Sequence, residues 1–328
     1  MAEATLAAVT GLAIILAMAV GANNSAAAMG TAYGAGIRTR RQSLLIVFVF
    51  FFLGAVLGGA KVTGSIAGGY VDVRLLTGQT APVMAVTALS ALFILTTNYL
   101  RAPISTALST IFCIVGVGLY TSGLNVPFFL TNAVWWVLTP AAAILGGFVW
   151  ARWVHPWALE RVADFGAEEK VNRILALSLT FTGSYIAFSI GANSLGKAMG
   201  PAVGFGLDAP TAILLGAIAM SVGAVLMGAR VIHTVGKDIA EICPIRAGGV
   251  EMVSGTIIIL AAFLGIPISV TQTHTSSVIG LSMGKKGVRG TVKIKVVKRT
   301  LMAWFSVPVA AVVLTYGILW LLGWKPPA

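Results

Sequence analysis

Charged residues are scarce in this 328-residue chain: Asp, Glu, Lys and Arg together make up only 10% of it. Soluble domains carry about 25% charged residues. Hydrophobic residues reach 58%, and the mean hydropathy is +0.94. This composition excludes an ordinary soluble domain and predicts a polytopic protein embedded in the lipid bilayer.

Cysteine, histidine and acidic residues are too few and too scattered for a catalytic or metal centre. The two cysteines, Cys113 and Cys243, form no CxxC pair. The histidines have no second ligand at helical spacing, and almost all acidic residues fall in expected loops. The sequence therefore predicts no metal, no cofactor and no enzymatic activity. An intramembrane enzyme stays as an alternative, which turnover in detergent would reveal.

Acidic residues are also outnumbered by basic ones, 10 to 22, which gives a net charge of +12. A basic chain can indicate nucleic-acid binding. Here, however, the basic residues lie in short segments between apolar runs, as cytoplasmic loops do under the positive-inside rule. We therefore expect no nucleic-acid partner.

Eight apolar runs are long enough to cross the membrane, for which about 20 helical residues suffice. They are residues 3–22, 43–59, 80–99, 128–151, 174–192, 212–228, 249–266 and 300–323. Two further segments, 102–120 and 267–283, begin with Pro-Ile-Ser or the residue before it, and we expect them to form broken helices or hairpins. The predicted fold is an all-α polytopic membrane protein with about ten crossings.

Three motifs recur in the same order about 170 residues apart, which predicts two structural repeats. The pairs are GANNSAAAMG at 21–30 with GANSLGKAMG at 191–200, GAKV at 59–62 with GARV at 228–231, and PIS at 103–105 with PIS at 267–269. We call 21–30 and 191–200 the first and second signature. Both interrupt an apolar run with small polar residues, so we expect the helix to loosen there and line a substrate site.

The repeats divide the chain into four parts. These are a first repeat at 1–125, a linker span and loop at 126–172, a second repeat at 173–299 and a C-terminal helix at 300–328.

Equivalent loops of the two repeats carry opposite charge bias. Arg38, Arg40 and Arg41 follow the first signature and no base follows the second, whereas only the second repeat closes on a basic run, 285–299. The positive-inside rule then places these loops on opposite faces, so the repeats are inverted. We expect both termini outside the cell membrane and loops 153–173, 229–247 and 284–299 in the cytoplasm.

Hydroxyl groups gather where the two Pro-Ile-Ser segments begin. Ser105 and Thr106 follow Pro103, while Ser269, Thr271 and Gln272 follow Pro267. A helix that starts this way directs free N–H groups and hydroxyls outward, which favours an anion. Two such ends facing each other would surround a tetrahedral oxyanion. The competing interpretation is that these Ser and Thr residues only mediate helix packing.

The paired signatures and Pro-Ile-Ser segments resemble the inorganic phosphate transporter (PiT) family, which includes a sulfate permease branch. The resemblance spans both repeats and implies an inverted-repeat transporter that binds its anion between two hairpins. It also implies that Ser105, Thr106, Ser269, Thr271 and Gln272 contact the anion, with Val270 in place of a usual Thr. Asn23 and Asn193 are the signature asparagines.

The signatures depart from the family pattern at two kinds of position. Asn24 and Ser194 replace aspartates that the resemblance identifies as sodium ligands, so full sodium sites are not expected. Lys197 stands in the second signature only, and an ionisable residue at membrane depth indicates a function. We expect Lys197 to supply fixed positive charge; the alternative is that it snorkels to the interface.

The expected donors are hydroxyls, amides, N–H groups and Lys197, with no carboxylate among them. Such a site suits sulfate, which only accepts hydrogen bonds, better than phosphate, which still carries a proton. Without the aspartates, a proton is the simpler coupling ion, with Glu251, His274 and His233 as candidate carriers. Sodium-coupled phosphate transport is the alternative, and an anion channel is the alternative of another class. A homodimer is compatible with the sequence, which does not determine the oligomeric state.

Overall fold

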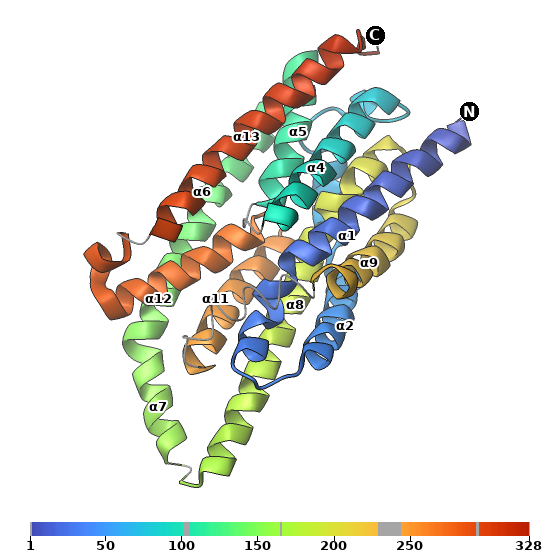
Figure 1. Ribbon diagram of the computed structural model, residues 1–328. Helices are drawn as coiled ribbons and strands as arrows, with labels where there is room; N and C mark the ends of the chain where they lie inside the picture. Colours follow the sequence, from blue (N-terminus) through green and yellow to red (C-terminus); the bar gives the residue numbers. More distant parts are fainter. Residues whose placement is uncertain (1, 101–104, 165, 229–243, 293–294, 328) are drawn as a thin grey trace.

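A computed structural model describes residues 2–100, 105–164, 166–228, 244–292 and 295–327, and these form a bundle of helices (Figure 1). The part of the chain so described contains no β-strand beyond one isolated bridge between Val71 and Leu124. The helices are α1 (Ala2–Gly34), α2 (Arg40–Gly58), α3 (Ala60–Gly68), the 3-10 turn η1 (Val73–Leu75), α4 (Thr80–Leu100), α5 (Thr106–Thr121), α6 (Val126–Val149), the π-helix η2 (Trp150–Val154), α7 (His155–Ala163), α8 (Glu168–Phe205), α9 (Ala209–Leu226), α11 (Pro244–Phe263), α12 (Val270–Val292) and α13 (Lys295–Leu321).

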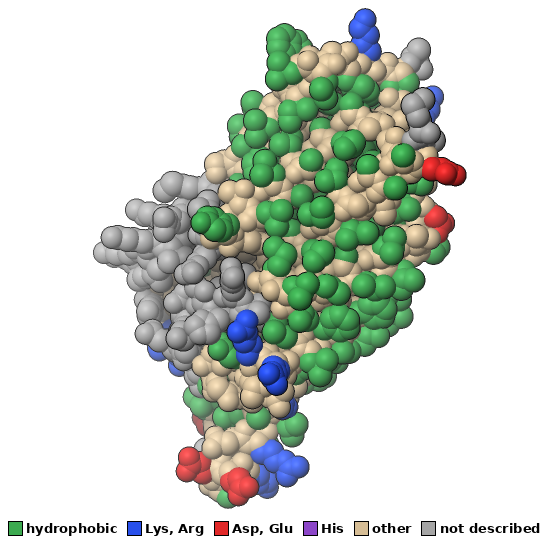
Figure 2. All heavy atoms as spheres, turned by 45° about the vertical axis from the view of Figure 1, so that its right-hand side comes forward, with side chains coloured by type: hydrophobic (Ala, Val, Ile, Leu, Met, Phe, Trp, Pro, Cys, Tyr) green, Lys and Arg blue, Asp and Glu red, His purple; other side chains and the backbone are tan. Residues whose placement is uncertain are grey.

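All eight predicted spans lie in helices that are long and apolar enough to cross a membrane, which confirms them. Figure 2 shows the matching surface: apolar side chains cover the middle of the molecule, and charged ones lie towards its ends. The chain is therefore an all-helical, multi-pass membrane protein. Helices α5 and α12 start directly after the two Pro-Ile-Ser motifs, so Pro267 precedes its helix instead of standing in the first turn as expected; residues 101–104 lie outside the described part.

Two of the stretches expected in the cytoplasm are largely helical, and their placement on that side of the membrane stays a prediction. Residues 153–173 contain the end of η2, all of α7 and the start of α8, and residues 284–292 belong to α12. Polar residues do not by themselves end a helix. Two glycines in these stretches have a left-handed backbone, Gly166 between α7 and α8 and Gly287 of α12, each with a φ of 72°. The loop expected at 229–247 lies outside the described residues up to 243.

The two signatures do not break their helices, contrary to the prediction. Helix α1 continues through residues 21–30, and α8 continues through 191–200. In α1 the polar side chains bond to their own helix: Asn24 Nδ2 donates to the Val20 carbonyl at 3.1 Å and Ser25 Oγ to the Ala22 carbonyl at 2.8 Å. These bonds satisfy the polar groups without loosening the backbone.

The signature glycines instead allow helices to cross closely. A Cβ atom at Gly21 would overlap the Met220 carbonyl oxygen of α9, and one at Gly191 would overlap the Phe51 carbonyl oxygen of α2. Small residues commonly permit such approaches in membranes. Because α1 meets α9 while α8 meets α2, each signature helix packs on the second helix of the other repeat.

We expect Gly21→Ala to destabilise the protein by about 1–3 kcal/mol, since the added methyl group must push α1 away from α9. Gly11→Ala is the matched control on the same helix, because nothing lies within 4 Å of a Cβ there. The control should be neutral or stabilising by up to about 1 kcal/mol. Thermal unfolding in detergent measures both, and equal midpoints for the two variants would contradict this account of the signature.

The helix directions agree with inverted repeats. In Figure 1, α1 descends from the N-terminus while α8 ascends from the opposite end, and the two termini lie at the same end of the molecule. The later helices also exchange partners: α6 packs on α12, and α13 packs on α5. Helices α5 and α12 also contact each other, α8 contacts both of them, and α1 contacts α12.

Candidate anion site

Helices α5 and α12 begin with the same hydrogen-bonded cap. Ser105 Oγ accepts the Leu108 backbone N–H at 3.1 Å, and Ser269 Oγ accepts the Gln272 backbone N–H at 3.1 Å. The next turn is equivalent too, since Ser109 Oγ and Thr273 Oγ1 donate to the carbonyls of the two cap residues, each at 2.9 Å. Each capping hydroxyl still has its own proton to donate. The two N-termini are therefore matched, buried donor sites.

Several buried polar atoms near these caps have no hydrogen-bond partner among the described residues. They are Thr106 Oγ1 and Thr110 Oγ1 of α5, Asn193 Oδ1 of α8, and His274 Nε2 and Ser276 Oγ of α12. Thr106 and Thr110 stand one helical turn apart, so their hydroxyls lie on one face of α5. Buried polar groups are nearly always satisfied by protein, water or ligand. These atoms are available to a polar ligand.

The turn between α11 and α12 is held by side chains from three other helices, α3, α6 and α8. Four of its carbonyls accept a hydrogen bond: Phe263 from Lys61 Nζ at 2.9 Å, Gly265 from Ser65 Oγ at 2.6 Å, Ile266 from Asn193 Nδ2 at 3.0 Å and Pro267 from Trp136 Nε1 at 3.0 Å. These bonds fix the position of Ser269, which follows immediately. Of the four donors, sequence reasoning identified only Asn193.

An asparagine of the first signature also forms hydrogen bonds to another helix, at the end of α4. Asn23 Nδ2 donates to Asn98 Oδ1 at 2.7 Å, and Asn98 Nδ2 donates to the Ala19 carbonyl at 3.1 Å. Of the signature asparagines, Asn23 thus contacts α4 and Asn193 contacts the turn between α11 and α12. Asn24 does not join them, because its amide bonds within α1.

Lys197 is fully buried, with 0% of its side chain exposed. Its ammonium group donates to Ser194 Oγ at 3.4 Å, and Asn193 lies one turn away on the same helix. Snorkelling to the interface is therefore not what the side chain does. The one ion pair in the described part of the chain joins Arg74 and Asp72 at the surface at 2.8 Å, where the Arg74 hydrogen bond lowers the pKa of Asp72. Lys197 thus has no described carboxylate as its partner.

Among the described residues, Glu251 is the one acidic residue that is buried, and its exposure is also 0%. The Thr31 hydroxyl of α1 donates to Oε1, and the Thr182 hydroxyl of α8 donates to Oε2 at 2.5 Å. The carboxyl group therefore joins helices of both repeats to α11 without a described cationic partner. Neither threonine stood out in the sequence, because each lies far from Glu251 along the chain.

The remaining candidates lie at the start of α12. Gln272 is buried and partners Ser269 through its backbone, and Thr271 and His274 are partly buried in the same two turns. His233 lies outside the described residues. No three His, Cys, Asp or Glu residues come together within the described ranges.

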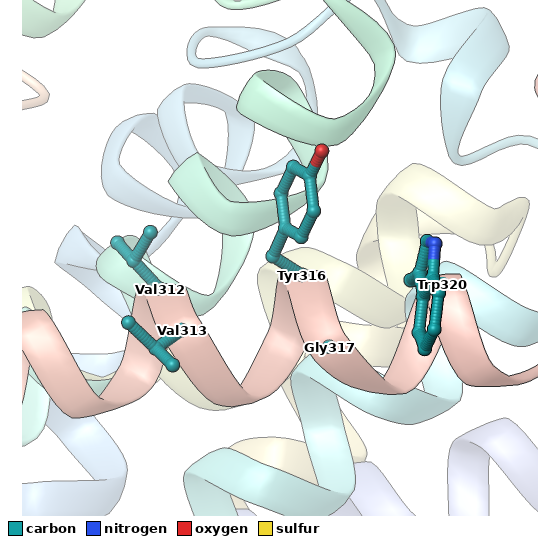
Figure 3. A pocket seen from close by; sticks show the side chains of 5 residues that line it. All are labelled: Val312, Val313, Tyr316, Gly317 and Trp320. Carbon is teal, nitrogen blue, oxygen red and sulfur yellow. The ribbon is translucent and has the colours of Figure 1, made fainter.

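A recess on the outer face of α13 is not part of this site. Figure 3 shows its lining side chains along one helix: Val312, Val313, Tyr316, Gly317 and Trp320. They are almost entirely apolar, and Trp320 is 67% exposed. Such a surface suits lipid chains rather than an inorganic anion.

Known proteins with similar sequences are transporters and permeases of inorganic anions. The family model described as the phosphate transporter family matches residues 20–315. The sulfate permease CysP of Bacillus subtilis is 32% identical over 92% of this chain and 84% of its own length. A putative phosphate permease of Pyrococcus abyssi is 28% identical over 95% of this chain and 97% of its own. A probable low-affinity inorganic phosphate transporter of Mycobacterium tuberculosis is 31% identical over 94% of this chain and 76% of its own.

One solved structure, that of a sodium-dependent phosphate transporter, superposes with a TM-score of 0.83 at 24% identity. The superposition covers 98% of this chain and 99% of the other. The two chains therefore share one fold.

Proposed function

Because this chain belongs to the phosphate transporter family, we propose that it is a secondary-active importer of an inorganic oxyanion, sulfate rather than phosphate, driven by protons. That it is a transporter and not an enzyme follows from the family and its relatives. The finer statements rest on the site. The observation that carries them is a buried lysine, without a described carboxylate partner, beside the asparagine that holds the second hairpin.

The anion would lie between the N-termini of α5 and α12. Ser105 and Ser269 offer hydroxyl protons there, and the first backbone N–H groups of each helix favour negative charge. Thr106, Thr271 and Gln272 extend the donor set. Lys197 adds the positive charge that a buried dianion needs, and the anion in turn supplies the countercharge that Lys197 needs. Alternating access would move the hairpins and signature helices about this site.

Sulfate is favoured over phosphate by the kind of groups present. Sulfate accepts hydrogen bonds only, whereas phosphate near neutral pH also has a proton to donate. Glu251, the buried carboxyl group among the described residues, already accepts hydrogen bonds from two threonine hydroxyls. The named relatives do not decide the matter, because sulfate and phosphate carriers occur at similar identity.

Proton coupling is favoured by Glu251, a buried carboxyl group that one proton would neutralise, with His274 as the second candidate. The competing function is sodium-coupled phosphate uptake, which the likeness to the solved sodium-dependent phosphate transporter favours. Against it, Asn24 and Ser194 are uncharged, and Asn24 bonds within its own helix.

Because α6 packs on α12 and α13 packs on α5, we propose different boundaries for the two repeats. If α6 closes the first repeat and α13 closes the second, the repeats extend beyond 125 and 299 and consist of equivalent sets of helices. Placement in the cell membrane with both termini outside the cytoplasm remains our prediction from the basic loops.

Uptake of labelled sulfate and phosphate into proteoliposomes, with proton and sodium gradients imposed separately, tests the proposal. We expect sulfate to accumulate above its external concentration only under an inward proton gradient. Sodium-dependent phosphate uptake without sulfate transport would refute the substrate and the coupling ion. Equilibration without accumulation under either gradient would instead indicate a channel.

A further inference from the structure

Basic side chains gather around the π-helix η2, where α6 passes into α7. Arg152 lies in η2 and His155 follows it, while Arg246 comes from the first turn of α11 and Lys285 from α12. The three elements are in contact there. Trp150 Nε1 donates to the Ile245 carbonyl at 3.3 Å, and a Cβ atom at Gly284 would lie 2.6 Å from the Ala151 Cβ.

The positive charges in this cluster lie close together, and no acid among the described residues pairs with them. Arg246 Nε donates to His155 Nε2 at 3.2 Å, so that ring nitrogen is an acceptor. The positive charges of Arg246 and Lys285 both act on the buried His155 ring. The described acids on the elements packed there form no ion pair with the cluster: Glu160 and Asp164 of α7 have none, and Glu251 of α11 is bonded to threonines.

The cluster is separate from the proposed transport site. Arg246 is in the first turn of α11, and the turn that positions Ser269 follows Phe263 at its other end. At 1.5 Å per residue the two ends are about 25 Å apart. An anion bound between the hairpins does not reach the cluster.

Two exposed tryptophan side chains in η2 and α7 indicate that this stretch lies at the membrane–water interface. Trp153 of η2 is 60% exposed and Trp157 of α7 is 58% exposed. Tryptophan is enriched at the level of lipid headgroups, and these two follow directly after the apolar span of α6. Basic pockets between membrane helices at this depth bind anionic headgroups, and guanidinium is well suited to the phosphate group. We therefore propose that Arg152, Arg246 and Lys285 form a binding site for the phosphate of an anionic phospholipid.

The test compares the intact protein in phosphatidylcholine vesicles with and without phosphatidylglycerol, by native mass spectrometry of retained lipid and by thermal unfolding. We expect phosphatidylglycerol to be retained and to raise the unfolding temperature. Arg246→Gln should weaken its retention about fivefold, the effect of one cation near a membrane surface. Arg173→Gln, an exposed arginine of α8, is the matched control and should behave as the wild type.

Lys285→Gln provides a second variant should Arg246→Gln fail to fold. If the Arg173→Gln control lost as much phosphatidylglycerol retention as Arg246→Gln, any surface charge would have the same effect, and the proposal would be overturned. Equal stabilisation by soluble glycerol phosphate in phosphatidylcholine vesicles would assign the site to a free anion instead of a lipid. Neither readout depends on which anion the protein transports.

Discussion

Lys197→Met protein should fold normally and yet take up sulfate at least about tenfold more slowly than the wild type. The ammonium group is fully buried and its described hydrogen-bond partner is Ser194, at 3.4 Å. A charge-assisted hydrogen bond contributes about 1.5–3 kcal/mol, which corresponds to a factor of about ten or more in affinity. Removing a buried charge without an ion-pair partner should not cost stability and can increase it.

This separation of transport from stability distinguishes a functional lysine from a structural one. Uptake rate, the concentration for half-maximal uptake and the unfolding midpoint are measured on the same reconstituted protein. Lys325→Met, at an exposed position near the C-terminus, is the matched control and should leave all three unchanged. Unaltered uptake by Lys197→Met would remove the lysine from the anion site, and a large loss of stability would make its role structural.

Glu251→Gln should abolish accumulation driven by a proton gradient while preserving exchange of labelled sulfate across the membrane. As a carboxylate, Glu251 accepts a hydrogen bond from the Thr31 hydroxyl at one oxygen and from the Thr182 hydroxyl at the other. When Glu251 is protonated, one of these hydrogen bonds is reversed or lost. Binding of a proton therefore changes the contact between α1, α8 and α11. Glutamine has nearly the same shape but cannot gain or lose that proton.

Counterflow and gradient-driven uptake are measured separately to check this prediction. Glu160→Gln, at an exposed position on α7, is the control and should accumulate sulfate as the wild type does. If Glu251→Gln still responds to the proton gradient, the carboxyl group is not the proton carrier, and His274 becomes the candidate to test. Loss of exchange together with accumulation would indicate a structural role at the three-helix junction.

The sequence predicted the membrane helices well, because their signal is local. A run of apolar residues is readable without knowing its neighbours, so all eight spans lie in helices. The caps at Ser105 and Ser269 were also predictable, since a hydroxyl residue directly before an apolar helix accepts an N–H from its own first turn.

The contacts of the polar residues could not be predicted in the same way. Thr31 lies 220 residues from Glu251 and Thr182 lies 69 residues away, yet both bond to it. Lys61, Ser65 and Trp136 hold the turn before Ser269 from separate parts of the chain. Nothing in their local sequence distinguishes them from residues that only pack, because hydroxyl and indole groups find partners wherever helices meet.

The order of residues alone was enough to establish a helical membrane protein, to predict two related halves and to locate the donor-rich helix ends. The packing of the helices was needed to show that the signatures are continuous helices, that Lys197 is enclosed instead of snorkelling, and that Glu251 joins both repeats. The difference arises because hydropathy and capping depend on neighbours within one turn. Burial of a charge and pairing of a buried polar group depend instead on which distant helices pack against it.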